Sequence, residues 1–135
     1  MDIKIWYIIN YKPKMSTELT FTDNIESFKA EILQNNPGLV ILKFSAEWCG
    51  PCKQIAGHVD ECVDTLPENV LFYEIDIDKF IKVYGHFLNK KMVRGIPAML
   101  CWEKRNKTLI PDDSMNSSSI YEVNQFFERC IELLD

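Results

Sequence analysis

This 135-residue chain lacks several features that would assign it to a class at once. It has no apolar run long enough to cross a membrane, no internal repeat and no low-complexity tract. Basic residues are in the minority, 15 against 20 acidic ones, so the net charge is −5. Because nucleic acids and anionic membranes attract positive protein surfaces, this balance argues against both as partners.

The beginning of the chain also lacks the pattern of a secretory signal. Residues 1–10 hold only a short apolar stretch, and no small-residue cleavage site follows it. The five cysteines are an odd number, and a chain with 47% hydrophobic residues can bury a core without disulfide staples. We therefore expect a single α/β domain in the cytoplasm, where spare cysteines stay as thiols.

Two of the cysteines, Cys49 and Cys52, stand at Cys-X-X-Cys spacing between a predicted strand and a predicted helix. The strand is the apolar run 38–44, and apolar residues at helical spacing over 55–66 indicate the helix. Cys49 should therefore lie at a helix start, where unpaired backbone N–H groups and the helix dipole favour the thiolate. We predict that Cys49 is the nucleophile and that Cys52, more buried, resolves the mixed disulfide.

A Cys-X-X-Cys pair can also be half of a structural zinc site, which normally needs a second pair of ligands. No second pair is evident, because the other cysteines stand singly and the two histidines show no ligand spacing. These residues are Cys62, Cys101, Cys130, His58 and His86. We therefore predict that the protein binds no metal. The two histidines are expected at the surface or at helix caps, and the three cysteines in apolar environments. A regulatory thiol among these three cysteines is left open.

The residues around the pair resemble the thioredoxin family, and two motifs carry the resemblance. They are Trp48-Cys49-Gly50-Pro51-Cys52-Lys53 and, further along, Arg94-Gly95-Ile96-Pro97. The resemblance covers about residues 19–134 and implies an α/β thioredoxin fold, with a central mixed β-sheet flanked by helices on both faces, and no cofactor. It also implies a cis peptide bond before Pro97 and a substrate surface made by Trp48, Gly50, Pro51, Ile96 and Pro97.

The implied partners are disulfide-containing protein substrates and an upstream disulfide reductase such as a thioredoxin reductase.

Residues 16–135 are predicted to be the thioredoxin-like domain. Residues 1–15 precede it as an N-terminal extension, either an extra strand or a loosely attached segment. The hydrophobic periodicity and cap residues predict the following elements: a strand at 19–21, a helix starting at Asp23 and ended by 36–38, a strand at 71–78, a helix at 80–87, a hairpin of 98–102 with 107–110, and a last helix capped by Ser119.

Lys43 is the main departure from the family pattern, because many thioredoxins bury an aspartate there, beneath the second cysteine. Glu74 falls where some members carry a lysine, so the two signs are exchanged. An unpaired buried ammonium is costly, so we expect Lys43 to pair with Glu74, to reach water, or to lie there uncharged. We hypothesise that Glu74, a water or the leaving thiolate accepts the proton of Cys52, while Lys43 shifts the cysteines toward the anion.

Three smaller features concern the helix and the substrate surface. Gly57 stands where the family commonly has a proline that kinks the active-site helix, and residues 112–114 replace a glycine-containing turn of the flat substrate surface. A short basic cluster, Lys90, Lys91 and Arg94, is expected to be a solvated loop. The alternative is that its place just before Pro97 brings positive charge near the dithiol, in favour of the thiolate or of acidic protein partners.

Two functions fit these residues. The first is a protein dithiol-disulfide oxidoreductase that reduces protein disulfides through Cys49 and Cys52. The second is a binding module that uses the surface around Trp48 and Pro97, with redox activity incidental. The intact Cys-Gly-Pro-Cys sequence favours the enzyme, and the altered buried charge favours the module.

Overall fold

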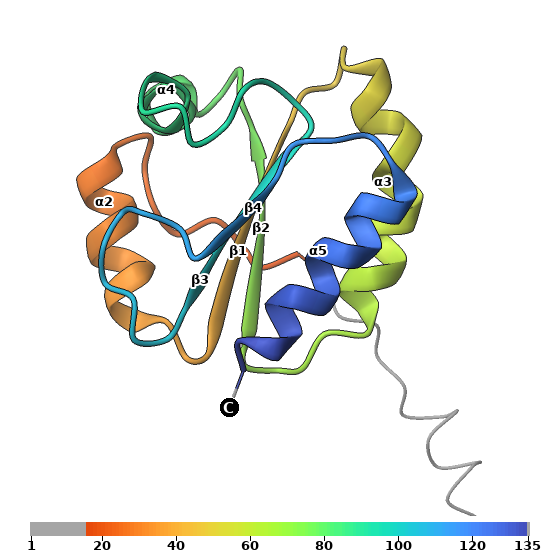
Figure 1. Cartoon of the computed structure of the whole chain (residues 1–135). Helices are drawn as coiled ribbons and strands as arrows, with labels where there is room; N and C mark the ends of the chain where they lie inside the picture. The colour runs from red at the N-terminus through yellow and green to blue at the C-terminus, as the bar shows by residue number, and fades with distance from the viewer. Residues whose placement is uncertain (1–15, 135) are drawn as a thin grey trace, which may run out of the picture.

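The computed structural model describes residues 16–134, so the predicted extension of residues 1–15 lies outside the described residues. A four-stranded sheet, in the order β2-β1-β3-β4, separates two layers of helices (Figure 1). The elements are α2 (Ile25–Glu31), a 3-10 turn η1 (Leu33–Asn35), β1 (Leu39–Ser45), α3 (Gly50–Asp64), β2 (Val70–Asp76), α4 (Ile81–Asn89), β3 (Ala98–Glu103), β4 (Asp113–Met115) and α5 (Ile120–Glu132). Strands β1 and β2 run parallel, whereas β3 is antiparallel to both β1 and β4.

The sheet is buried on both faces, which explains why β1 reads as a continuous apolar run. Alternate residues of β1 serve opposite layers. Val40 and Leu42 belong to the core under α2 and α4, and Leu39 and Ile41 to the core under α3 and α5. We call these two sides the α2/α4 face and the α3/α5 face (Figure 1). The predicted mixed sheet with helices on both faces is confirmed.

The α2/α4 face is packed mainly by aromatic rings. The ring centroid of Trp102 lies 5.3 Å from that of Phe28 and 5.6 Å from that of Phe87. Phe21 joins the same cluster, with its ring centroid 5.3 Å from that of Phe28. Tilted and edge-on ring pairs at these distances are the favourable aromatic arrangements. This face therefore holds a dense core made mainly of apolar and aromatic side chains.

Helix α4 begins without a cap from its own N-terminal residue. Asp23 supplies the cap from a distance, since its carboxylate accepts hydrogen bonds from the backbone N–H groups of Lys82 (3.1 Å) and Val83 (2.9 Å). Asn24 caps α2, accepting from two N–H groups of the first turn at 2.8 and 3.2 Å. The prediction that Asp23 caps the first helix is wrong by one residue, since Asn24 caps α2. Asp23 instead caps α4 and so links the two helices of this face.

Two predicted strands are wrong. Residues 19–21 form no strand; instead, Thr17 donates its backbone N–H to the carbonyl of Phe72 (2.6 Å), and Phe21 inserts into the aromatic cluster. The partner of β3 is Asp113–Met115 and not residues 107–110. The side-chain amide of Asn106 donates to the carbonyl of Ile110 (2.8 Å), which holds 107–110 in a loop. The remaining predicted helices and strands are confirmed within a few residues at their ends.

Candidate active site at the start of helix α3

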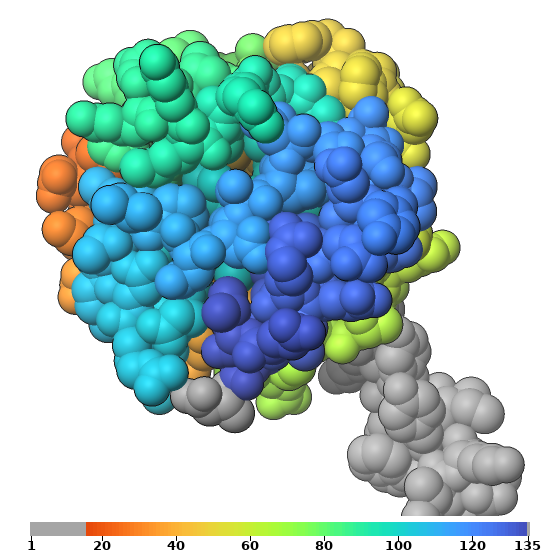
Figure 2. Space-filling view, in the orientation of Figure 1, coloured from red at the N-terminus to blue at the C-terminus, as the bar shows by residue number. Residues whose placement is uncertain are grey.

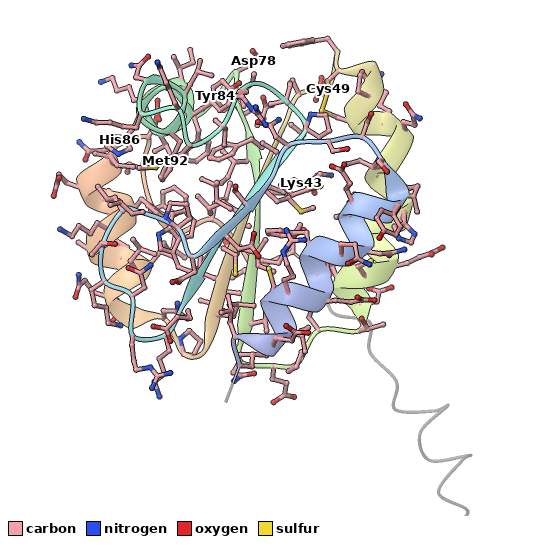
Figure 3. The ribbon with its side chains drawn as sticks, viewed as in Figure 1. Lys43, Cys49, Asp78, Tyr84, His86 and Met92 are labelled. Carbon is pink, nitrogen blue, oxygen red and sulfur yellow. A yellow bond between two sulfur atoms is a disulfide. The ribbon has the colours of Figure 1, made fainter. Side chains whose placement is uncertain are left out.

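Cys49 and Cys52 lie where β1 leads into α3, as the sequence predicts (Figure 3). They are joined by a disulfide, with their Cα atoms 5.3 Å apart. Cys49 is the N-cap of α3, and its Sγ atom accepts a hydrogen bond from the backbone N–H of Cys52 at 3.2 Å. Pro51 occupies the first turn, where its missing N–H leaves no gap in the helix. The first sulfur thus lies at the positive end of a 15-residue helix, which favours a thiolate.

The two cysteines are almost equally buried in the disulfide form, at 4% exposed for Cys49 and 3% for Cys52. Cys52 is thus the more buried of the two, as predicted, but only by this small margin. The reason is local packing, because Ala46, Ile77 and Ile96 gather around both cysteines. Access to Cys49 must come along the rim made by its neighbours.

Trp48 forms one side of that rim, with 66% of its surface exposed. Its indole N–H donates a hydrogen bond to Asp78 at 2.9 Å, which fixes the ring at the surface. Gly50 and Pro51 are exposed beside it. Sequence reasoning missed Asp78, whose only signal is its position just after the end of β2.

The loop that ends in Pro97 forms the other side. The Ile96–Pro97 peptide bond is cis, which confirms the prediction, and Ile96 packs against the two cysteines. Asn116, just after β4, braces this loop: its side-chain amide donates to the carbonyls of Gly95 (3.2 Å) and Pro97 (3.0 Å), and its carbonyl oxygen accepts from the backbone N–H of Arg94.

Asn116 corrects the prediction for residues 112–114. Those residues do not form a turn beside the dithiol, because Asp113 and Ser114 belong to β4. The segment that reaches the Pro97 loop lies just beyond the strand. A polar residue after a short strand gives little warning of such a role, and the sequence reasoning missed Asn116.

Lys43 lies on the α3/α5 face of β1, directly opposite Glu74 in the register with β2 (Figure 3). Its Nζ atom is 3.0 Å from Oε1 of Glu74, so pairing is the alternative that the structure adopts. Lys43 is 2% exposed and Glu74 is 43% exposed. The buried ammonium of Lys43 needs such a partner, since loss of Glu74 would leave an uncompensated charge buried.

A cavity of about 250 Å³ connects this ion pair with the dithiol. Lys43, Glu74 and Cys52 all contribute to its lining, together with the exposed side chains of Glu47 and Lys53. The exchanged charges of the sequence thus lie beside the second cysteine.

The other sulfur and imidazole groups lie away from this site. Cys62 is half-buried, 3.7 Å from Nε2 of His58, and burial followed by the Glu61 carboxylate raises the pKa of its thiol. Cys101 and Cys130 are fully buried on the α3/α5 face. Burial also lowers the pKa of His86, helped by Lys90, although Glu26 opposes the shift.

Across residues 16–134 no three His, Cys, Asp or Glu side chains gather as a metal site. No helix in that range has the length and apolar character needed to cross a bilayer.

A cysteine pair at a strand-to-helix turn, covered by a cis-proline loop, defines the class of thioredoxin-fold proteins. The thioredoxin family model matches residues 19–125, and this chain belongs to the thioredoxin family. Thioredoxin 1 of Plasmodium falciparum (isolate 3D7) is 46% identical over 56 residues, which cover 42% of this chain and 51% of that relative. The thioredoxin of Rickettsia typhi is 35% identical over 77 residues, covering 57% and 69% of the two chains.

Solved structures agree in fold. A thioredoxin structure from Plasmodium falciparum has a TM-score of 0.59 at 26% identity and covers 77% of this chain and 91% of its own. The thioredoxin of Trichomonas vaginalis reaches a TM-score of 0.64, covering 84% and 96%, and at 22% identity it shows the fold alone. The chain spans only 51–59% of the length of the first four curated relatives that it matches.

Proposed function

We propose that this protein is a dithiol-disulfide oxidoreductase that reduces protein disulfides. The observation that carries the proposal is the Cys49–Cys52 bridge at the N-terminus of α3, beside the cis Ile96–Pro97 bond. Membership of the thioredoxin family supports it. A pair that can form this bridge inside the folded protein can also give up two electrons when it closes.

The reaction has two steps. The Cys49 thiolate attacks one sulfur of the client disulfide, so a mixed disulfide forms and the first client thiolate leaves. The Cys52 thiolate then attacks the sulfur of Cys49, the protein disulfide closes, and the second client thiolate leaves. Two electrons pass to the client, and each leaving thiolate takes up a proton. An upstream disulfide reductase, such as a thioredoxin reductase, would return the two electrons.

Glu74 is proposed as the group that accepts the proton of Cys52 in the second step. The shared cavity and the exposed edge of Glu74 support this role, because the carboxylate can pass the proton to water. Lys43 is a positioning residue: it holds Glu74 at 3.0 Å and adds a positive charge on the side of the sheet where the thiolates form.

The client is proposed to lie across Trp48, Gly50 and Pro51 on one side and Ile96 and Pro97 on the other. The exposure of Trp48 and the packing of Ile96 against the cysteines support this surface. A reducing compartment such as the cytoplasm suits the reaction, since it would keep both the pair and the three other cysteines as thiols.

Insulin reduction tests the proposal. The wild-type protein, kept reduced by an excess of a small thiol, should accelerate insulin reduction, and Cys49→Ser should abolish the acceleration. Cys52→Ser should instead accumulate a mixed disulfide with the client, because the second step is blocked. Cys62→Ser is the matched control and should retain the wild-type rate. A wild-type protein without Cys49-dependent turnover would leave the binding module as the function.

Single-turnover reduction of insulin at a series of pH values tests the role of Glu74. Glu74→Gln should slow the second step on the order of 10²-fold, in the range that one acid-base group contributes. Glu47→Gln is the matched control, because Glu47 lines the same cavity without the contact to Lys43. If the pH profile of Glu74→Gln equals that of the wild type, the glutamate is not the proton acceptor.

A further inference from the structure

We propose that a basic groove next to the Pro97 loop selects disulfide-containing clients that carry acidic residues close to the attacked cysteine. The groove encloses about 590 Å³, and the side chains that matter here are Lys91, Arg94, Asn116, Tyr121, Glu122 and Arg129. The inference rests on the proposed oxidoreductase function and adds a substrate class to it.

The groove adjoins the dithiol through a short stretch of backbone. Asn116 lines the groove and also binds the carbonyls of Gly95 and Pro97, while Ile96 between them packs on the cysteines. In Figure 2 the teal segment near residue 90 and the blue segment near residue 120 adjoin on the face toward the viewer. An extended client advances about 3.3–3.6 Å per residue. Because Asn116 lines the groove and binds the Pro97 loop, a short extended stretch of client chain lying over Pro97 would enter the groove.

The groove has two positive charges that the protein itself does not neutralise. Lys91 and Arg94 are both exposed, and neither forms an ion pair within residues 16–134. Arg129 is different, because its guanidinium binds both oxygens of Asp113, at 2.7 and 3.1 Å. Glu122 is the one carboxylate among the lining side chains. The groove is thus a local positive patch on a chain of net charge −5, which makes it complementary to carboxylates.

The backbone at Lys91 gives a second, independent reason. Lys91 has φ 60, a left-handed conformation at the end of α4, and its N–H donates to the carbonyl of Leu88 at 3.0 Å. Glycine usually occupies this position after a helix, because a side chain makes the conformation less favourable. The presence of a lysine in this unfavourable conformation suggests that its side chain has a function. Here the side chain brings a positive charge to the groove.

Tyr121 completes the site on the opposite wall, in the first turn of α5. It is 71% exposed, and the half-buried Met92 lines the same groove. Tyr121 and Met92 would pack against the apolar stem of a bound side chain, while its charged end binds Lys91 or Arg94. The combination fits glutamate or aspartate side chains in an extended segment.

Three disulfide-linked peptides of equal length test the proposal. In the first, glutamates stand within six residues of the cysteines; in the second and third, glutamine or lysine replaces them. We expect kcat/KM of the wild type to be about three- to tenfold higher for the glutamate than for the glutamine peptide, as two exposed charge pairs would give. The preference should shrink from 10 mM to 300 mM salt, because salt screens exposed charges.

The double variant Lys91→Gln/Arg94→Gln should bring the ratio of the two kcat/KM values close to one. Lys82→Gln/Lys104→Gln is the matched control, with the same charge change at two exposed lysines outside the groove, and it should keep the wild-type ratio. The reversed pair Lys91→Glu/Arg94→Glu should prefer the lysine peptide. Circular dichroism checks that each variant is folded.

Equal kcat/KM values for the glutamate and glutamine peptides would overturn the groove proposal and leave the oxidoreductase proposal intact. So would a preference that survives in Lys91→Gln/Arg94→Gln, or one that is equally lost in the control. A wild-type protein that reduces none of the three peptides, with no reaction at Cys49, would instead overturn the oxidoreductase proposal and this inference together.

Discussion

The two faces of the sheet are built for different purposes. The α2/α4 face is filled by aromatic rings, with Phe28, Phe87 and Trp102 fully buried. The α3/α5 face holds all the cysteines, either at the start of α3 or in contact with its apolar core, and the buried ion pair of Lys43 and Glu74. The difference teaches that this small domain separates its aromatic core from its cysteines and its buried ion pair by one layer of strands.

In strand β1, neighbouring residues serve the two faces separately. Leu42 and Phe44 point to the aromatic side, and Lys43 between them points to the side of the dithiol. Because side chains of a strand alternate between the faces, a single residue can add a charge to one core without disturbing the other. Three substitutions and one labelling experiment test the comparison between the two faces, from the largest expected effect to the smallest.

Phe28→Ala should produce the largest loss of stability. The side chain is fully buried among aromatic rings, so its removal leaves a cavity, and we expect a loss of about 3–5 kcal/mol in the free energy of unfolding. Urea unfolding measures this loss. The rate of insulin reduction per folded molecule should stay at the wild-type value. A variant that loses activity while it remains fully folded would break the separation of the two faces.

Lys43→Met should have the opposite profile. The substitution removes the buried charge itself, and the remaining partner Glu74, 43% exposed, can be solvated by water. No uncompensated charge is left buried, so we expect little change in the free energy of unfolding. The pH profile of dithiol reactivity should move to higher pH by on the order of one unit, since a nearby cation favours a thiolate. Lys53→Met, at an exposed position of the same cavity, is the control. A large loss of stability with an unchanged pH profile would contradict the prediction.

The cysteines of the α3/α5 face should differ in their reaction with iodoacetamide. Because burial and Glu61 raise the pKa of Cys62, less of its thiol is ionised at pH 7. A cysteine at a helix N-terminus ionises far more readily, so Cys49 of the reduced protein should be alkylated at least about tenfold faster. Labelling of Cys62 should accelerate as the pH rises from 7 to 9. Equal rates at pH 7, measured by peptide mass spectrometry, would contradict this order.

Gly57→Ala should have the smallest effect, a gain in stability. A Cβ atom at Gly57 meets nothing within 4 Å, and the residue lies inside α3, so alanine should add about 0.5–1 kcal/mol. Gly38→Ala is the contrasting control, because its Cβ would lie 2.8 Å from the backbone oxygen of Asn69. It should lose stability in the same urea measurement. A loss at Gly57 would show that this glycine has a role that the helix does not reveal.

Much of the fold is predictable from local sequence, because buried strands and amphipathic helices have distinct periods. The failures occur where a polar side chain reaches across the structure. Asp23 caps a helix about sixty residues away, and Asn106 holds residues 107–110 in a loop where the sequence predicts the second strand of a hairpin. Neither contact has a signal in the neighbouring residues.

The candidate site likewise contains residues that the sequence predicts and residues that it does not. The positions of Cys49, Cys52 and Pro97 follow from motifs, and the opposition of Lys43 and Glu74 follows from one register between two strands. Asn116 could not be predicted, because its role depends on where β4 ends relative to the Pro97 loop. Sequence patterns therefore locate the reactive atoms, while the residues that orient the loops around them depend on tertiary contacts.

The most direct test of the central claim measures which cysteines of the protein become oxidised while insulin disulfides are reduced. The reduced protein is mixed with insulin, the reaction is stopped with an alkylating reagent, and the peptides are weighed. The peptide that contains Cys49 and Cys52 should lose two hydrogens and resist alkylation, in step with the appearance of two thiols for each insulin disulfide that opens. Insulin that loses disulfides while this peptide stays fully alkylated, or an oxidised bridge at any other cysteine pair, would contradict the claim.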